Sequence, residues 1–299
     1  MQNNYAPIIV FAFNRVDAIK NLTESLLRNE ESSQSDIFFF VDGPRANKHE
    51  DIPVNAVKEY IKSITGFKSI NYSFSDVNNG LGNSIIKGVT EVIEIYGKAI
   101  ILEDDLICSK NLLSFMNQGL DKYQDNKDVF SICGYTNTIK LPKGYNYDAY
   151  SCVRSSSWGW ATWKDRWNSI DWKLTNWEEC KKHKSEFNKW GGSDCFGMLK
   201  GWKEGKNKSW AIRFCYSQFV QNKIAIFPTT SKISNEGFDG SGTNCKKYSR
   251  FKSTPDNTIN KIFKWPNDVT IIKTIKESAL SYHTIYKRIY SKIIYILQK

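Results

Sequence analysis

Short apolar runs alternate with amphipathic stretches along the first 135 residues of the chain. Four of the runs predict β-strands, over residues 7–13, 36–41, 69–74 and 99–102. Apolar residues at helical spacing between them predict three helices, over residues 17–28, 53–65 and 84–96. Asp17 is the expected N-cap of the first helix, and Gly97 is the expected stop of the third. Regular alternation of strand and helix predicts an α/β fold, in which helices flank a mainly parallel sheet and ligands bind beyond the carboxyl ends of the strands.

The pattern changes in the middle of the chain. Nine of the ten tryptophans lie between Trp158 and Trp210, and regular strand patterns become rare there. A strand is predicted over residues 223–228, and the glycine-rich stretch 235–242 is predicted to be a loop. We therefore expect an aromatic region of less regular structure after the first α/β half.

Helical spacing returns from Ile271 to the end of the chain. One face carries apolar residues, namely Ile285, Ile289, Ile293 and Leu297. Basic residues lie beside this face, and no acidic residue follows Glu277. Two interpretations are open: an amphipathic basic helix that lies on anionic lipid, with its tyrosines at the level of the headgroups, or a helix that packs on the core of the domain.

Composition narrows the class of protein. A chain of 299 residues with 40% hydrophobic residues suits one sizeable domain and excludes a disordered or collagen-like chain. The 42 basic and 31 acidic residues give a net charge of +11, which favours nucleic acid, anionic lipid or phosphate-bearing molecules as partners. Neither a signal peptide nor a transmembrane segment is recognisable, so we expect a cytoplasmic protein.

Cysteine and histidine usage limits the kinds of metal site. The seven cysteines are scattered and never spaced as Cys-x-x-Cys, which predicts reduced and mostly buried thiols. The three histidines are not spaced as a zinc ligand pair. Any metal ion is therefore expected to bind carboxylates.

The fourth predicted strand ends in three acidic residues, Glu103, Asp104 and Asp105. Their carboxylates repel one another, so a cation or basic groups must offset their charge. Hard divalent ions such as Mg²⁺ or Mn²⁺ prefer oxygen ligands and leave coordination positions open for phosphate oxygens. The triplet therefore indicates a metal site for a diphosphate. The alternative is a solvated turn in which Asp105 caps a following helix.

Further polar residues follow the other predicted strands on the same side of the sheet. Arg15 follows the first strand and could offset a phosphate or orient a carboxylate. Asp42 follows the second strand and could accept a hydrogen bond from a base or a ribose. Gly80 and Gly82 open the third helix, where glycines let backbone amides approach an anion.

The order of these motifs resembles that of GT-A-fold, nucleotide-sugar-dependent glycosyltransferases of a bacterial surface-polysaccharide type, similar to the N-acetylglucosaminyltransferase I family. The resemblance spans most of residues 7–245 and leaves out the C-terminal helix. It rests on six short pieces of sequence, at residues 13–15, 41–43, 102–106, 158–160, 210–213 and 235–245.

The resemblance implies a metal-dependent, inverting transfer of a sugar from a UDP-sugar to a saccharide acceptor that is lipid-linked, in the synthesis of surface polysaccharide such as O-antigen or capsule. The triplet would be the DXD motif, with Asp105 as the direct ligand of Mn²⁺ (or Mg²⁺) and Asp104 beside it. Glu103 would face the ribose or the sugar of the donor. Arg15 and Asp42 would hold the nucleotide, together with the loop of Gly80 and Gly82.

The same resemblance divides the chain and its tasks. Residues 1–135 would bind the nucleotide sugar, residues 136–255 would bind the acceptor, and residues 256–299 would form a basic helical extension. An acceptor wall is expected from the tryptophan-rich segment, because an aromatic ring stacks on the apolar face of a sugar. The expected members of this wall are Trp158, Trp160, Trp210 and Arg213. Such an enzyme would work as a peripheral protein at the anionic inner face of the bacterial membrane.

The position that supplies the catalytic base in the resembled family, an aspartate after a tryptophan, is here Ala211. Asp194 is the first alternative, with Asp239 and Glu236 behind it, although Asp194 could also be a plain helix N-cap. The loss of this aspartate also allows a second hypothesis, a noncatalytic protein that binds a saccharide or a nucleotide sugar. A third hypothesis, nucleic-acid binding, has the charge but no recognisable binding module.

Overall fold

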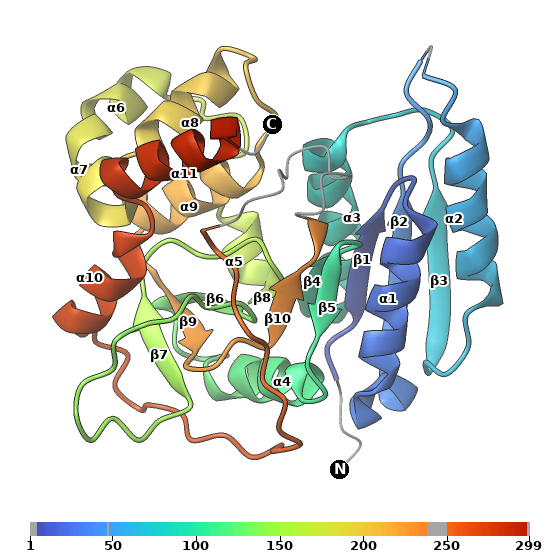
Figure 1. The fold of residues 1–299 in the computed structure, drawn as a ribbon, viewed down its shortest axis with the longest axis horizontal. Helices are drawn as coiled ribbons and strands as arrows, with labels where there is room; N and C mark the ends of the chain where they lie inside the picture. The colour runs from blue at the N-terminus through green and yellow to red at the C-terminus, as the bar shows by residue number, and fades with distance from the viewer. Residues whose placement is uncertain (1–4, 47, 238–249, 298–299) are drawn as a thin grey trace.

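The computed structural model describes residues 5–46, 48–237 and 250–297, which form an eight-stranded sheet and a two-stranded ribbon between layers of helices (Figure 1). In spatial order, the strands of the sheet are β3 (Ser69–Phe74), β2 (Asp36–Val41), β1 (Ile8–Ala12), β4 (Lys98–Glu103), β8 (Trp160–Trp163), β6 (Val129–Cys133), β9 (Ile224–Pro228) and β7 (Ala149–Cys152). The ribbon pairs β5 (Leu106–Cys108) with β10 (Ile233–Asn235) in antiparallel fashion.

Six of the eight strands run in one direction, namely β1 to β4, β6 and β9. Strand β8 runs against its neighbours β4 and β6, and β7 runs against β9 at the sheet edge. The expected α/β fold with a mainly parallel sheet is therefore confirmed. The sheet takes strands from residues on both sides of position 135, so the two expected halves share one sheet.

The three predicted helices of the first half match the structure within a few residues. They are α1 (Val16–Leu27), α2 (Asp51–Ser63) and α3 (Leu81–Tyr96). The structure adds two helices that were not predicted, the short 3-10 helix η1 (Glu30–Gln34) before β2 and α4 (Leu112–Lys122). Gly97 ends α3 with a φ of 76°, a left-handed conformation that favours glycine, as expected. The expected N-cap of α1 is wrong: Arg15 holds that position, and Asp17 lies in the first turn, where its charge still favours the helix dipole.

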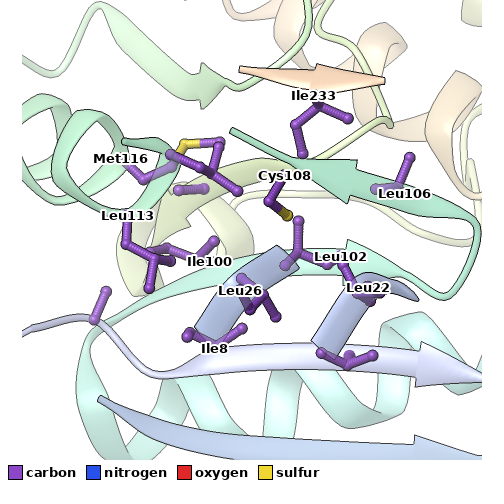
Figure 2. Packing of buried hydrophobic residues seen from close by; sticks show 14 of the residues in the cluster. Ile8, Leu22, Leu26, Ile100, Leu102, Leu106, Cys108, Leu113, Met116 and Ile233 are labelled. Carbon is purple, nitrogen blue, oxygen red and sulfur yellow. The ribbon is translucent and has the colours of Figure 1, made fainter. Parts of the chain in front are cut away.

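Both faces of the sheet are covered, which explains why the parallel strands read as continuous apolar runs. Ile8, Val10 and Ala12 of β1 belong to a cluster with α1, α2 and α4, whereas Ile9 and Phe11 belong to a cluster on the α3 side. Figure 2 shows side chains of β1, β4, α1, α4 and the ribbon meeting in the first cluster. Packing from both sides fixes where the strands end, and hence where the polar residues after them lie.

After β8, the described residues of the tryptophan-rich segment form short helices and no further strand. They are α5 (Lys164–Asn168), α6 (Trp177–Lys182), α7 (Lys184–Gly191), α8 (Cys195–Lys203) and α9 (Ala211–Val220). Helices α6 to α9 enclose an apolar cluster of their own, which includes Phe187, Leu199 and Tyr216. The six cysteines among the described residues are buried free thiols.

The C-terminal part contains two helices where the pattern suggested one. Helix α10 (Lys273–Ser281) packs through the buried Ile275 against the cluster beside β7, and α11 (Ile285–Leu297) follows after a break. Before α10, the chain runs without regular structure along α4, where the Tyr123 hydroxyl donates to the Pro266 carbonyl at 2.7 Å. None of the helices in the described part of the chain is long and apolar enough to cross a lipid bilayer.

Candidate active site

The acidic triplet lies at the carboxyl edge of the parallel strands. Glu103 is the last residue of β4, and Asp104 and Asp105 form the turn that leads into the ribbon strand β5. The Asp104 amide donates to the Phe11 carbonyl of β1 at 3.0 Å, and this bond extends the β1–β4 pairing by one step. Sheet and ribbon thus hold the turn from both sides, so the carboxylates project from a rigid support.

Arg15 is the counter-charge of this turn. It follows β1, and its Nη2 forms a short hydrogen bond with Asp104 Oδ1 and lies 3.2 Å from Asp105 Oδ2. Burial of the guanidinium opposes its charge, but the two carboxylates outweigh burial and raise the pKa of Arg15. The predicted role of orienting a carboxylate therefore fits this geometry, and one guanidinium faces three acidic residues.

Two carboxyl groups of the triplet, those of Glu103 and Asp104, have raised pKa values because they are buried. Burial raises the pKa of Glu103 to about 8, and the neighbouring charges of Asp105 and Asp104 add to the effect. Burial also raises the pKa of Asp104 to about 6, although Arg15 opposes this. Positive charge at the turn would relieve this penalty, since it favours the ionised form of each carboxyl group.

The donor set fits a divalent ion of the magnesium or manganese kind. Across residues 5–46, 48–237 and 250–297, no three acidic, histidine or cysteine side chains converge as a ready metal site. Asp104 and Asp105 do converge, on Arg15 Nη2. Ions of this kind commonly bind through one or two carboxylates together with substrate phosphates and water, so two convergent carboxylates are sufficient.

Two neighbours of Asp105 were not predicted from the sequence. Asn235 Nδ2 lies 3.4 Å from Asp105 Oδ1, and a Cβ added at Gly237 would come within 2.6 Å of Asp105 Oδ2. The Glu236 amide donates to the Asp105 carbonyl at 2.9 Å, and its side chain is exposed. The sequence predicts a loop over residues 235–242, but Asn235 is the last residue of strand β10. This three-residue strand forms by pairing with β5, which lies far away in the sequence, so it has no recognisable local pattern.

Asp42 has a clear structural task beside its predicted one. Its Oδ1 accepts from the Asn79 amide at 2.8 Å and its Oδ2 from the Gly80 amide at 2.8 Å, and the Gly43 amide is a further donor at 3.2 Å. These bonds fix the loop before α3, where Gly80 has a φ of 78°. Asp42 thus positions the loop that was expected to approach an anion.

A basic residue that the sequence did not single out lies over this loop. A Cβ at Gly82 would be 2.5 Å from the Lys208 carbonyl oxygen, so only glycine allows the segment before α9 to cross the start of α3. A Cβ at Gly80 would lie 3.8 Å from Lys208 Nζ. An ammonium group therefore lies near the amino end of α3, which itself favours anions.

A cavity of about 350 Å³ adjoins β4 on its Trp158 side, although none of the three residues of the acidic triplet lines it. The cavity and β4 are adjacent because β8 runs antiparallel to β4: Trp160 pairs with Ile101, and a Cβ at Gly159 would lie 3.2 Å from Leu102 Cδ2. The residues before Gly159 line the cavity, Trp158 among them. Other aromatic walls are Tyr135, Tyr150, Phe227 and Phe251.

Asp194 and Ala211 both line this cavity. Asp194 is the N-cap residue of α8 but makes no capping bond, because its two oxygens accept from Arg154 Nη1 at 2.7 Å and Nη2 at 2.9 Å. Although burial opposes it, Arg154 lowers the pKa of Asp194 to about 2. The ion pair keeps the carboxylate charged and oriented, and makes it a weak base.

The other proposed bases lie elsewhere. The Glu236 carboxyl group lies on the exposed loop beside the acidic turn. Asp239 lies outside the described residues. Beside Asp194, His283 completes the cavity wall, and burial lowers its pKa to about 3, so it is neutral at physiological pH.

Most of the expected acceptor wall lies in the interior instead. Trp160 is 1% exposed, and its ring centroid lies 4.9 Å from that of Trp210 and 5.8 Å from that of Trp167. Arg213 is buried, donates to the Trp172 carbonyl at 2.7 Å and lies over the Trp202 ring. Large aromatic rings commonly build the core, and here only Trp158 of the expected wall reaches the cavity.

Comparisons with known proteins give likeness in structure alone. No family model matches the sequence, and no curated protein matches it. The neighbours in structure are glycosyltransferases. Residues 1–349 of TarS from S. aureus have a TM-score of 0.42 at 9% identity, covering 78% of this chain and 61% of that one. A longer TarS structure has a TM-score of 0.42 at 9% identity, covering 77% of this chain and 36% of that one.

GalNAc-T7, solved with UDP, GalNAc and Mn²⁺, has a TM-score of 0.47 at 11% identity, covering 82% of this chain and 46% of that one. This chain thus spans less than two thirds of the length of each of these structures. At such identities and TM-scores, likeness carries no conclusion about activity. The functional argument therefore depends on the site itself.

Proposed function

We propose that this protein is a metal-dependent glycosyltransferase that moves a sugar from a UDP-sugar to a saccharide acceptor with inversion at the anomeric carbon. The observation that carries the proposal is the proximity of two sites: convergent carboxylates on a rigid turn at the end of β4, and an aromatic cavity whose Trp158 side adjoins β4. The first has the chemistry to bind a cation with a diphosphate, and the second to bind a sugar ring.

Residues of the acidic turn would hold the donor. Asp105 and Asp104 would bind Mn²⁺ or Mg²⁺, whose charge would stabilise the departing diphosphate. Arg15 keeps both carboxylates oriented, and Glu103 lies beside them at the end of β4. Lys208 and the loop of Gly80 and Gly82 supply positive potential on the same side of the sheet.

The acceptor would bind in the cavity, with Trp158 as its aromatic wall. Asp194 is the proposed base for the acceptor hydroxyl, since it lines the cavity close to Ala211. A general base contributes about a hundredfold to ten-thousandfold in rate and works best with a pKa near the working pH. The low pKa of Asp194 therefore supports a contribution at the lower end of that range.

The proposed setting is the synthesis of bacterial surface polysaccharide, such as O-antigen or capsule, on a lipid-linked acceptor at the anionic inner face of the membrane. The basic surplus of the chain supports a partner of this charge.

The test is the stabilisation of the protein by UDP with and without Mn²⁺. A ligand at 100 times its Kd stabilises the folded state by about 2.7 kcal/mol, and we expect this effect only when both are present. Asp105→Asn should abolish the stabilisation by UDP with Mn²⁺. Asp125→Asn, at an exposed carboxylate elsewhere, should retain this stabilisation. If no nucleotide stabilises the protein under either condition, the donor site does not exist.

A noncatalytic saccharide or nucleotide-sugar binding protein is the second candidate. Ala211 in the cavity and the ion-paired state of Asp194 favour it, because neither supplies a strong base. Tight Mn²⁺-dependent binding of UDP-sugars, without transfer to any acceptor and without donor hydrolysis, would select this candidate.

A further inference from the structure

Helix α11 presents an apolar face to solvent. Five of its described side chains are between 49% and 81% exposed, namely Ile285, Tyr286, Ile289, Tyr290 and Ile293. At about 100° per residue, these five lie within an arc of about 140° on one side of the helix. We call this arc the outer face of α11. A helix at the surface of a water-soluble domain normally turns such an arc toward the core.

Among the described side chains of α11, residues 285–294, those that contact the protein are mainly polar. Arg288 Nη1 donates to Ser193 Oγ at 3.1 Å, and Ser193 Oγ donates to the His283 carbonyl at 3.0 Å. Arg288 and Ser291, on the side opposite the outer face, are partly buried. In Figure 1, α11 is drawn in front of α8 and α9, and the Arg288–Ser193 bond joins it to the segment just before α8. The polarity of the helix is therefore inverted relative to a helix that packs on a core.

Positive charge borders the outer face on both sides. At about 100° per residue, Lys292 lies just beyond Ile285 at one edge of the arc and Lys287 lies beyond Tyr290 at the other. No carboxylate follows Glu277 in the sequence. Basic residues beside an apolar arc that carries tyrosines are the pattern of a helix in the plane of an anionic membrane surface.

We propose that the outer face of α11 docks on an anionic lipid surface, with the isoleucines below the headgroups and the two lysines among the lipid phosphates. A second copy of the chain fits this surface less well, since pairing two such faces would bring like charges together. Of the two interpretations that the sequence left open, the outer face favours a helix on anionic lipid over a helix packed on the core of the domain.

Docking would have a consequence for the cavity, and this step rests on the proposed function. Ala279 and Leu280 of α10, together with His283, form one wall of the cavity. The helix that lies on the membrane directly follows this wall. A saccharide carried on a lipid would therefore reach the cavity without leaving the membrane surface.

Co-sedimentation with vesicles tests the docking surface without any reaction. The full chain should bind vesicles of phosphatidylcholine mixed with phosphatidylglycerol, and bind vesicles of phosphatidylcholine alone much more weakly. I289Q/I293Q should reduce the partition coefficient at least about tenfold, since two apolar side chains are lost from the interface. K287Q/K292Q should lower it about fivefold per lysine, and only on the anionic vesicles.

The matched control is I52Q/I95Q, which changes two isoleucines of α2 and α3 that are 83% and 79% exposed. This variant should bind vesicles as the unchanged chain does. The proposal would be overturned if I289Q/I293Q and I52Q/I95Q lost vesicle binding equally. Equal binding of the unchanged chain to neutral and anionic vesicles would also overturn it. Sedimentation equilibrium provides a second readout: a dimer that I289Q/I293Q dissociates, without vesicle binding, would assign the face to a second copy.

Binding of UDP with Mn²⁺ separates this inference from the proposed function. All these variants should keep it, because none of the changed residues belongs to the acidic turn. Vesicle binding without nucleotide binding would support the docking surface and contradict the proposed function. Nucleotide binding without vesicle binding would support the proposed function and contradict the docking surface.

Discussion

Two groups of buried charged residues, those of the acidic turn and those of the cavity, differ in how their charge is balanced. At the acidic turn, three carboxylic residues share one guanidinium, and the pKa values of Glu103 and Asp104 are raised. In the cavity, Asp194 is the only carboxylate among the described residues that Arg154 is bonded to, through two hydrogen bonds, and the pKa of Asp194 is lowered. The turn therefore gains from an added cation, whereas the pair in the cavity is complete without a ligand.

This difference separates two uses of buried charge. Perturbed carboxyl groups that crowd together in a crevice are typical of binding and catalytic sites. A buried one-to-one ion pair with good geometry more often orders the structure around it. Gly192 is part of that order: a Cβ there would lie 2.6 Å from His283 Cβ and 2.9 Å from Arg154 Nη1.

The largest expected effect comes from breaking the pair in the cavity. Arg154→Met should lower the free energy of unfolding by about 3–5 kcal/mol, because it leaves the buried Asp194 carboxylate without its partner. Arg45→Met is the control and should have a smaller effect, since the Arg45 side chain is 43% exposed, against 13% for Arg154. Urea unfolding measures both, and equal effects would contradict the structural role of the buried pair.

The pH dependence of stability should have opposite signs in the two regions. Glu103 keeps its proton in the folded state from its ordinary pKa of 4.5 up to about 8, so without metal the free energy of unfolding should fall as pH rises through this window. One such group contributes a slope of at most about 1.4 kcal/mol per pH unit. Glu103→Gln should remove this slope above about pH 6, where Asp104, whose pKa is raised to about 6, no longer contributes.

Asp194 should act in the opposite direction. Its pKa is lowered from 3.8 to about 2, so the stability that it contributes is complete above pH 3.8 and is lost as pH falls toward 2. Asp194→Asn should flatten the acid side of the profile and leave the alkaline side unchanged. Urea unfolding over the pH range checks both variants, and an alkaline slope that survives Glu103→Gln would refute the assignment.

The smallest effect should come from Gly237→Ala. The added Cβ would lie 2.6 Å from Asp105 Oδ2 and should displace this carboxylate from Arg15 Nη2, the atom that Asp104 also contacts. We expect a loss of about tenfold in Mn²⁺ affinity, as for other residues that orient a metal ligand, with unfolding unchanged. Gly197→Ala, where a Cβ meets nothing within 4 Å, is the control in calorimetric titration with Mn²⁺.

The sequence alone determined the first half of the molecule well. Strands such as Asp36–Val41 and helices such as Leu81–Tyr96 follow from local apolar periodicity, and the alternation of the two implies a parallel sheet. Because parallel strands end at one edge, the sequence also predicted that Arg15 and the acidic triplet lie close together, as they do.

Tertiary structure decided what each charge and ring does. Trp158 and Trp160 are two residues apart in one motif, yet one lines the cavity and the other is stacked in the core, because packing and not local pattern sets their burial. Asp194 meets Arg154 only when α8 packs against the segment after β7, and the outer face of α11 is outward only because its polar side contacts Ser193. Periodicity shows that a helix has an apolar face, but the free energy of packing decides whether the protein or another surface covers it.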